Sequence, residues 1–162
     1  MSGVEYVVIQ FSILAYAVIG GVFLAFSDFI MRSLTLTCGH GGVEAMQSIN
    51  REVFRWVFMA LFLGMAAVSL VLAGYGTIGL SGPAGTVIML AGLTYLLGCF
   101  GVTLVFNVPM NNALARMASS HRTTRDYWLR IYVPRWTFWN SVRTVACMTA
   151  ASLLLLGTVW IG

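Results

Sequence analysis

The sequence has no lysine, and its 162 residues include only five acidic residues and nine arginines. Charged residues make up 9% of the chain, whereas hydrophobic residues make up 59%. A soluble domain carries about 25% charged residues, so this shortage of charge excludes an ordinary soluble domain and indicates an integral membrane protein. The arginines form no basic run, so the net charge of +4 does not point to nucleic-acid binding.

Cysteine and histidine are also scarce. Cys38, Cys99 and Cys147 lie far apart, and an odd number of cysteines without a CxxC motif argues against a disulfide framework or a zinc site. His40 and His121 lie in polar stretches, whereas a haem ligand would lie on an apolar helix. We therefore predict no metal site from the residues, while haem, quinone or a metal stays open as a cofactor.

Four hydrophobic runs are long enough to cross a bilayer, which takes about 20 helical residues. They cover, with approximate ends, residues 6–31, 56–74, 85–107 and 136–160. The first begins in MSGVEYVVIQF, which lacks the basic segment of a signal peptide, so we expect it to remain as a helix. The chain is predicted to be all-α, a single membrane domain (1–162) folded as a four-helix transmembrane bundle. Some glycines in the runs suit close helix packing, namely Gly20, Gly21, Gly64, Gly92 and Gly98.

The arginines predict the orientation of the bundle. The connection over residues 74–85 has no charge, whereas the connections after the first and third runs are rich in arginine. The positive-inside rule places these two connections in the cytoplasm and both termini outside (N-out/C-out). Eight of the nine arginines lie in or next to these connections: Arg32, Arg51, Arg55, Arg116, Arg122, Arg125, Arg130 and Arg135.

Helical extensions are expected on the cytoplasmic side. GGVEAMQSINREVFRW has no proline, so the second helix is expected to start near Gly42 or Val43. Pro109 should kink or end the third helix, and Pro134 suits a fresh start for the fourth. Between these prolines, TTRDYWLRIYV suits a short interfacial helix with three residues in an aromatic belt, Tyr127, Trp128 and Tyr132.

Polar side chains gather at the cytoplasmic end of all four runs. Trp136, Asn140 and Arg143 are spaced i, i+4 and i+7, so they share one face of the last helix, and Trp139 lies beside it. The other helices are expected to bring further polar and sulfur side chains to the same depth: Ser27, Asp28, Met31, Asn50, Asn107 and Asn111.

Asp28 and Arg143 are the two ionisable groups that we place inside the runs at this end. A lone charge in lipid is costly, so the two are expected to pair with each other or to line a wet cavity. Two interpretations stay open, a purely structural ion pair and a cluster that lines a ligand site. Trp136 and Trp139 suit an aromatic belt as well as ligand stacking, and Met31 suits core packing as well as a binding role.

Four motifs resemble those of the anthrone oxygenase-like integral membrane proteins, a family that is largely a bacterial domain of unknown function. They are FSDFIM (26–31), AMQSIN (45–50), FNVPMNNALA (106–115) and WTFWNSVR (136–143). The resemblance covers nearly the whole chain, in the same order and across four spans. It implies a multi-pass protein of the bacterial inner membrane. It also implies an oxygenase that turns a hydrophobic, anthrone- or phenol-like aromatic into a quinone with O₂, without a conventional organic cofactor.

Roles for individual residues follow from this resemblance. Asp28 is the available base, and Arg143 with Asn107 or Asn140 would stabilise an enolate oxygen. The substrate would be bound by Ser27, Met31, Asn50, Asn111, Trp136 and Trp139. An ion pair between Asp28 and Arg143 would weaken Asp28 as a base.

Other classes of protein stay open. The same slot would suit a small membrane redox or binding protein that holds a quinone or haem. A non-enzymatic partner subunit, or a homo-oligomer assembled through small residues, is also consistent with the sequence. A transporter is disfavoured, because the chain shows no inverted repeat and its polar cluster lies at one end of the spans.

Overall fold

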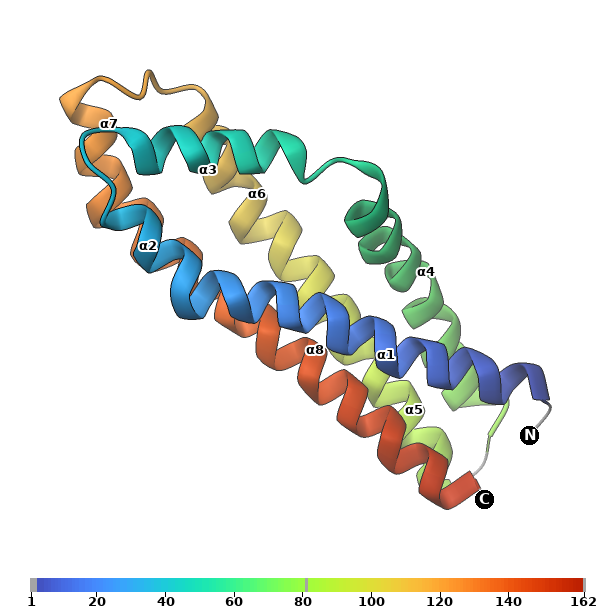
Figure 1. The fold of residues 1–162 in the computed structure, drawn as a ribbon. Helices are drawn as coiled ribbons and strands as arrows, with labels where there is room; N and C mark the ends of the chain where they lie inside the picture. The colour runs from blue at the N-terminus through green and yellow to red at the C-terminus, as the bar shows by residue number, and fades with distance from the viewer. Residues whose placement is uncertain (1–2, 81, 162) are drawn as a thin grey trace.

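A computed structural model describes residues 3–80 and 82–161, and these residues form helices and no strand (Figure 1). The α-helices are α1 (Gly3–Ala25), α2 (Met31–Thr35), α3 (Gly41–Glu52), α4 (Trp56–Ile78), α5 (Gly82–Tyr95), α6 (Val108–Ala115), α7 (Arg122–Tyr127) and α8 (Val133–Ile161). The π-helical segments are η1 (Phe26–Ile30), η2 (Leu96–Gly101), η3 (Thr103–Asn107) and η4 (Trp128–Tyr132). The all-α prediction is confirmed.

Several of these elements join into longer helices. Within the described residues, four continuous helices are long and apolar enough to span a membrane: Gly3–Thr35, Val57–Ile78, Gly82–Ala115 and Arg122–Trp160. This confirms the four-helix transmembrane bundle and shows a multi-pass membrane protein. The first, third and fourth helices continue past the predicted runs at their arginine-rich ends, as expected for helical extensions.

Figure 1 shows how the bundle is arranged. α8 packs along α1 and α5, and α4 packs along α5. The two chain ends lie at one end of the bundle, while α3 and α7 lie at the other. The arginine-bearing connections therefore share one end, as the charge pattern indicates. Which side of a membrane this end faces stays a prediction.

The second helix does not start near Gly42 as one continuous helix. α3 and α4 are separated by residues 53–55, where Arg55 has an extended backbone (φ −71°, ψ 154°). α3 runs across the end of the bundle (Figure 1). It buries Val43 and Met46 but exposes Glu44 and Arg51. An amphipathic helix of this kind is stable across the end of a bundle but not in lipid, which explains the corner.

The helix end expected at Pro109 and the fresh start expected at Pro134 are wrong, whereas a kink at Pro109 stays a prediction. The chain is helical through Pro109 and through Pro134. Each proline lies two residues after a π-helical segment, η3 for Pro109 and η4 for Pro134. The wider π-turn relieves the clash between the pyrrolidine ring and the preceding turn, so the helix continues.

The expected aromatic belt at residues 127–132 does not form as such. Trp128 and Tyr132 are 3% and 0% exposed, in a cluster with side chains from α2, α3 and α6. Since the fourth helix continues through η4, this aromatic face turns toward the bundle rather than the lipid. The cluster consists of Met31, Val43, Met46, Leu114, Trp128, Tyr132 and Trp136.

Close helix packing at glycine is confirmed at three of the five expected positions. A Cβ atom at Gly92 would lie 2.4 Å from the carbonyl oxygen of Ser69, and one at Gly98 would lie 2.7 Å from the Cβ of Ala146. At Gly20 the nearest contact would be 3.0 Å. The expectation is wrong for two positions where no atom lies within 4 Å, Gly21 and Gly64.

Candidate functional site

A cavity of about 860 Å³ lies at the arginine-rich end of the bundle, under the corner between α3 and α4. Side chains from α1, η1, α3, α4, η2, η3, α6 and α8 line it. Most of its wall is apolar, and its described side chains include the aromatic residues Phe23, Phe26, Phe54, Phe58, Phe62, Phe100 and Trp136. Its polar lining comes from Gln47, Asn50, Arg51, Thr103, Asn107, Asn111, Asn112 and Arg143.

Arg143 lies in the wall of this cavity and is 5% exposed. Its Nη2 donates to Oδ1 of Asn140 at 2.6 Å, and its Nη1 donates to Oγ1 of Thr103 at 3.2 Å. The guanidinium carbon lies 4.1 Å from the ring centroid of Phe23 and 5.4 Å from that of Trp136. A buried cation is thus held by neutral oxygen atoms and by aromatic faces.

Asp28 does not join this cluster, contrary to the expected pairing with Arg143. Asp28 is exposed and does not line the cavity. Within residues 3–80 and 82–161, the ion pairs are His40–Glu44 and Arg55–Glu52, and neither involves Asp28 or Arg143. The reason is the orientation of η1. Ser27 points toward α8, and Asp28, the next residue, is rotated from it by about a quarter turn of the helix.

Asn140 and Ser27 lie behind Arg143 rather than in the cavity wall. Asn140 is fully buried, and its Nδ2 donates to the carbonyl oxygen of Phe23 at 2.6 Å and to Oγ of Ser27 at 2.7 Å. Since its Oδ1 accepts from Arg143, one amide connects the end of α1 and η1 to the guanidinium. Both residues therefore position Arg143.

Asn107 lines the same cavity as Arg143 and has one side-chain atom without a partner among the described residues. Asn107 is 1% exposed, and its Nδ2 donates to the carbonyl oxygen of Trp136 at 3.3 Å. Among the described residues, Oδ1 of Asn107 and Nε of Arg143 are buried without a hydrogen-bond partner. Leaving such groups unpaired is costly, and both atoms are covered by protein, although the two residues themselves line the cavity.

A second set of hydrogen bonds connects α3 to the cavity wall. Oδ1 of Asn111 accepts from the hydroxyl of Tyr132 and from Nε1 of Trp136, both at 2.8 Å. Nδ2 of Asn50 donates to the Tyr132 hydroxyl at 3.3 Å. Asn50, Asn111 and Trp136 are thus brought together as predicted, whereas Tyr132 and Thr103 were missed. Tyr132 precedes Trp136 by four residues, so helical spacing already placed it on the same face.

Met31 and Trp139 lie outside the cavity. Met31 is 2% exposed and packs in the cluster with Trp128 and Tyr132. Trp139 stacks on Phe106, with ring centroids 3.6 Å apart and planes 5° from parallel. Neither lines the cavity, and both side chains pack against other side chains of the protein.

No group of three or more His, Cys, Asp or Glu side chains gathers as a metal site in the part of the chain that the structure describes. His40 and His121 line a separate pocket beside α3 and α7. Cys99 and Cys147 are free, and their sulfur atoms lie 3.4 Å apart inside the bundle.

These features define a small four-span membrane protein with an aromatic cavity and a buried guanidinium in its wall. The family model for anthrone oxygenase matches residues 51–153, and the chain belongs to this family. The matched region contains Asn107, Asn111, Trp136, Asn140 and Arg143. In comparisons with curated proteins and with solved structures, no protein matches the chain.

Proposed function

We propose that this protein is a membrane oxygenase that binds a flat hydrophobic aromatic, anthrone- or phenol-like, in the cavity and oxidises it with O₂. The observation that carries this proposal is the buried guanidinium of Arg143, which lies in an aromatic wall and has no carboxylate partner among the described residues. The proposed setting is the bacterial inner membrane, as the family resemblance implies.

The size and lining of the cavity support an aromatic substrate. Small-molecule sites typically measure about 300–1,000 Å³ and combine apolar walls with a few polar groups. The volume of about 860 Å³ falls in this range, and Phe23, Phe62 and Phe100 offer ring faces and edges. Exposed apolar residues at its edge, Val22, Phe54, Leu63 and Leu104, suit a substrate that arrives from lipid.

The charge of Arg143 suits a substrate that becomes an anion. An anthrone loses a proton to give an enolate whose negative charge lies largely on the oxygen of its carbonyl group. Arg143 and Asn107 both line the cavity, so the guanidinium can stabilise that oxygen and the amide can hydrogen-bond with a neighbouring hydroxyl group. Donors fixed in a site of low dielectric stabilise a developing oxyanion more strongly than water does.

The reaction balances without a further reductant. The enolate carbon transfers its electrons to O₂ and takes up both oxygen atoms as a hydroperoxide after protonation. Loss of water then leaves a carbonyl, so R₂CH₂ and O₂ give R₂C=O and H₂O. No carboxylate of residues 3–80 and 82–161 lines the cavity, so in this proposal the proton of the substrate passes to water at the cavity edge. This proposal therefore does not use Asp28 as the base.

A quinone-binding protein is the second candidate, because the same donor in Arg143 would bind a quinone oxygen. It is tested by mass spectrometry of the organic extract from gently purified protein. A stoichiometric quinone in the wild type, lost in Arg143→Gln, would support this second function.

The test of oxygenase activity is O₂ uptake and quinone absorbance with a hydroxylated anthrone, using protein in lipid nanodiscs. Anthrones oxidise slowly in buffer, so heat-denatured protein provides the background. We expect Arg143→Gln to lower the enzymatic rate about 100-fold, as removal of an oxyanion donor does. Arg135→Gln is the matched control, since Arg135 is an exposed arginine of the same helix and does not line the cavity.

Arg143→Lys distinguishes the effect of losing the charge from the effect of disturbing the fold, because it keeps a cation in the buried site. Thermal unfolding of all three variants shows which ones remain folded. A wild type no faster than denatured protein with any anthrone would overturn the proposal. So would a folded Arg143→Gln variant with the wild-type rate.

A further inference from the structure

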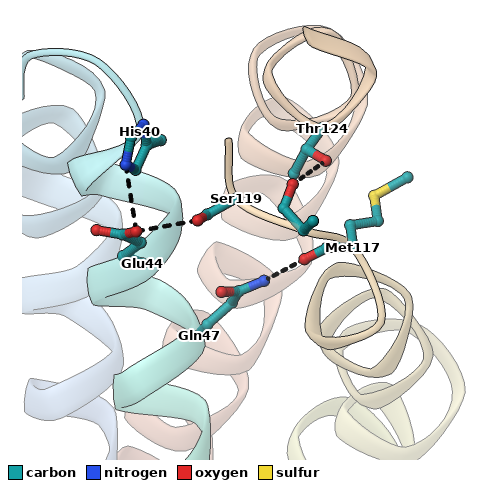
Figure 2. Close-up of polar contacts among 7 residues, drawn as sticks. His40, Glu44, Gln47, Met117, Ser119 and Thr124 are labelled. Atoms are coloured by element: carbon teal, nitrogen blue, oxygen red, sulfur yellow. Dashed lines mark hydrogen bonds and ion pairs between the residues drawn. The ribbon is translucent and has the colours of Figure 1, made fainter. Parts of the chain in front are cut away.

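A second pocket, of about 530 Å³, lies at the arginine-rich end of the bundle, outside the aromatic cavity. It is formed by the α2–α3 connection, the start of α3, the connection before α7, and the first turns of the α7–η4 helix. Figure 2 shows the contacts between these segments. Its polar lining includes hydroxyl groups from Thr35, Thr37, Ser119 and Ser120.

The charged lining of this pocket is mainly cationic. Arg122 and Arg125 both line it and are spaced i, i+3, so they share one face of the helix. Neither takes part in an ion pair within residues 3–80 and 82–161. His40 and His121 also line the pocket, and Asp126 is the one carboxylate that lines it in the described part of the chain. The hydroxyl groups of Thr35, Thr37 and Ser119 donate to other protein atoms, so the donors for a phosphate are the two guanidinium groups and the hydroxyl of Ser120.

The walls of the pocket are fixed by hydrogen bonds. Oε1 of Glu44 lies 3.3 Å from Nε2 of His40 and accepts from Oγ of Ser119 at 2.9 Å (Figure 2). Nε2 of Gln47 donates to the carbonyl oxygen of Met117 at 2.9 Å, and Oγ1 of Thr124 donates to that of Ala118 at 2.7 Å. Glu44 is therefore occupied by wall residues, and α3 holds the connection before α7 in place.

Part of the pocket lining is apolar. Leu34, Val43, Trp128 and Leu129 line it, and Trp128 is 3% exposed whereas Leu129 is 45% exposed. A ligand that combines an anionic group with apolar chains matches this lining. The pocket lies where three of the spanning helices extend beyond the predicted hydrophobic runs, which is the level expected for lipid headgroups.

We propose that this pocket binds the phosphate group of an anionic phospholipid headgroup, with Arg122 and Arg125 as the phosphate ligands. The acyl chains lie along the apolar side at Leu129. A soluble phosphate ester offers the same phosphate chemistry, so the experiment separates the two sources.

The experiment measures lipid retained by purified, delipidated protein in native mass spectrometry, titrated with phosphatidylglycerol and, separately, phosphatidylcholine. We expect wild type to retain phosphatidylglycerol and R122Q/R125Q to bind it about tenfold more weakly. The matched control is R116Q/R130Q, which removes two exposed arginines of the same end that do not line the pocket. This control should bind as wild type does. D126N should bind phosphatidylglycerol more tightly, because it removes the one carboxylate of the lining.

Inorganic phosphate and glycerol 1-phosphate are the probes for a soluble source. Competition by either at millimolar concentration, with no preference for phosphatidylglycerol over phosphatidylcholine, would replace the lipid by a soluble phosphate and overturn the lipid proposal. Equal weakening in R122Q/R125Q and R116Q/R130Q would show general surface attraction and overturn the pocket. Arg122 and Arg125 are exposed, so the variants are expected to fold, which thermal unfolding checks.

Discussion

The guanidinium of Arg143 and the amide of Asn140 lie three residues apart on α8 and share a 2.6 Å hydrogen bond inside the bundle. The amide oxygen of Asn140 accepts this bond, while its amide nitrogen donates to the carbonyl oxygen of Phe23 and to the hydroxyl of Ser27. Arg143 thus keeps its charge without a counter-charge, because neutral groups fix its position. This arrangement is the basis of the first two predictions.

Asn140→Ala should destabilise the fold and lower activity together. The change leaves the Phe23 carbonyl oxygen and one guanidinium nitrogen without their partner, which costs about 1–3 kcal/mol per buried group. Thermal unfolding in nanodiscs measures the loss. Thr158→Ala is the control, because its exposed hydroxyl bonds only to Leu155 of the same helix. Equal melting temperatures for the two variants would contradict the positioning role of Asn140.

Asp28→Asn should keep its fold and most of its oxygenase activity. Asp28 is exposed, does not line the cavity and forms no ion pair within the described chain, so loss of its charge leaves Arg143 unchanged. The assay is the O₂-uptake measurement used for Arg143→Gln. A loss of more than about tenfold in a folded Asp28→Asn variant would return Asp28 to the mechanism as a base.

Hydropathy and helical spacing predicted much of this architecture. Four apolar runs of about 20 residues or more leave few alternatives to four spanning helices. The spacing of Trp136, Asn140 and Arg143 correctly placed them on one side of α8. The cavity positions of Asn107 and Asn111 agree with the prediction that polar groups gather at one end.

The direction in which the Asp28 side chain points could not be predicted in the same way. The corner at residues 53–55 could not be predicted either. Spacing arguments assume 3.6 residues per turn, but η1 includes Asp28, and η3 and η4 precede the two prolines. Each π-turn accommodates an additional residue and rotates the positions that follow. The corner depends on α3 packing across the bundle end, a tertiary contact that local sequence does not show.

Tyr132→Phe should loosen α3 without disturbing the spanning helices. The change removes a hydroxyl that accepts from Asn50 and donates to Asn111, which is the polar connection between α3 and the wall at this point. Hydrogen–deuterium exchange of residues 41–52 should become faster, while the peptides of α5 and α8 keep their exchange rates. Tyr127→Phe is the control, because its hydroxyl takes no part in these bonds. Unchanged exchange in α3 would show that its apolar packing and the hydrogen bonds of Gln47 and Glu44 hold it without the Tyr132 hydroxyl.

Maleimide labelling should distinguish the three cysteines. Cys38 is exposed, whereas Cys99 and Cys147 are buried between the third and fourth spans. Native protein should therefore react at Cys38 alone, and protein unfolded in detergent should react at all three. Intact mass spectrometry counts the labels, and Cys38→Ser should abolish native labelling. Rapid labelling of Cys147 in native protein would contradict the packing of α8 against η2.

Gly92→Ala should destabilise the bundle, whereas Gly64→Ala should not. A Cβ atom at position 92 would lie 2.4 Å from the carbonyl oxygen of Ser69 and 2.9 Å from the backbone nitrogen of Ala73, so α4 and α5 would have to separate. Overpacking of this kind costs about 1–3 kcal/mol. At Gly64 no atom lies within 4 Å of the added methyl group, and alanine favours the helix by about 1 kcal/mol. Thermal unfolding should therefore shift the two variants in opposite directions. A Gly92→Ala protein as stable as Gly64→Ala would mean that α4 and α5 are not in backbone contact at this position.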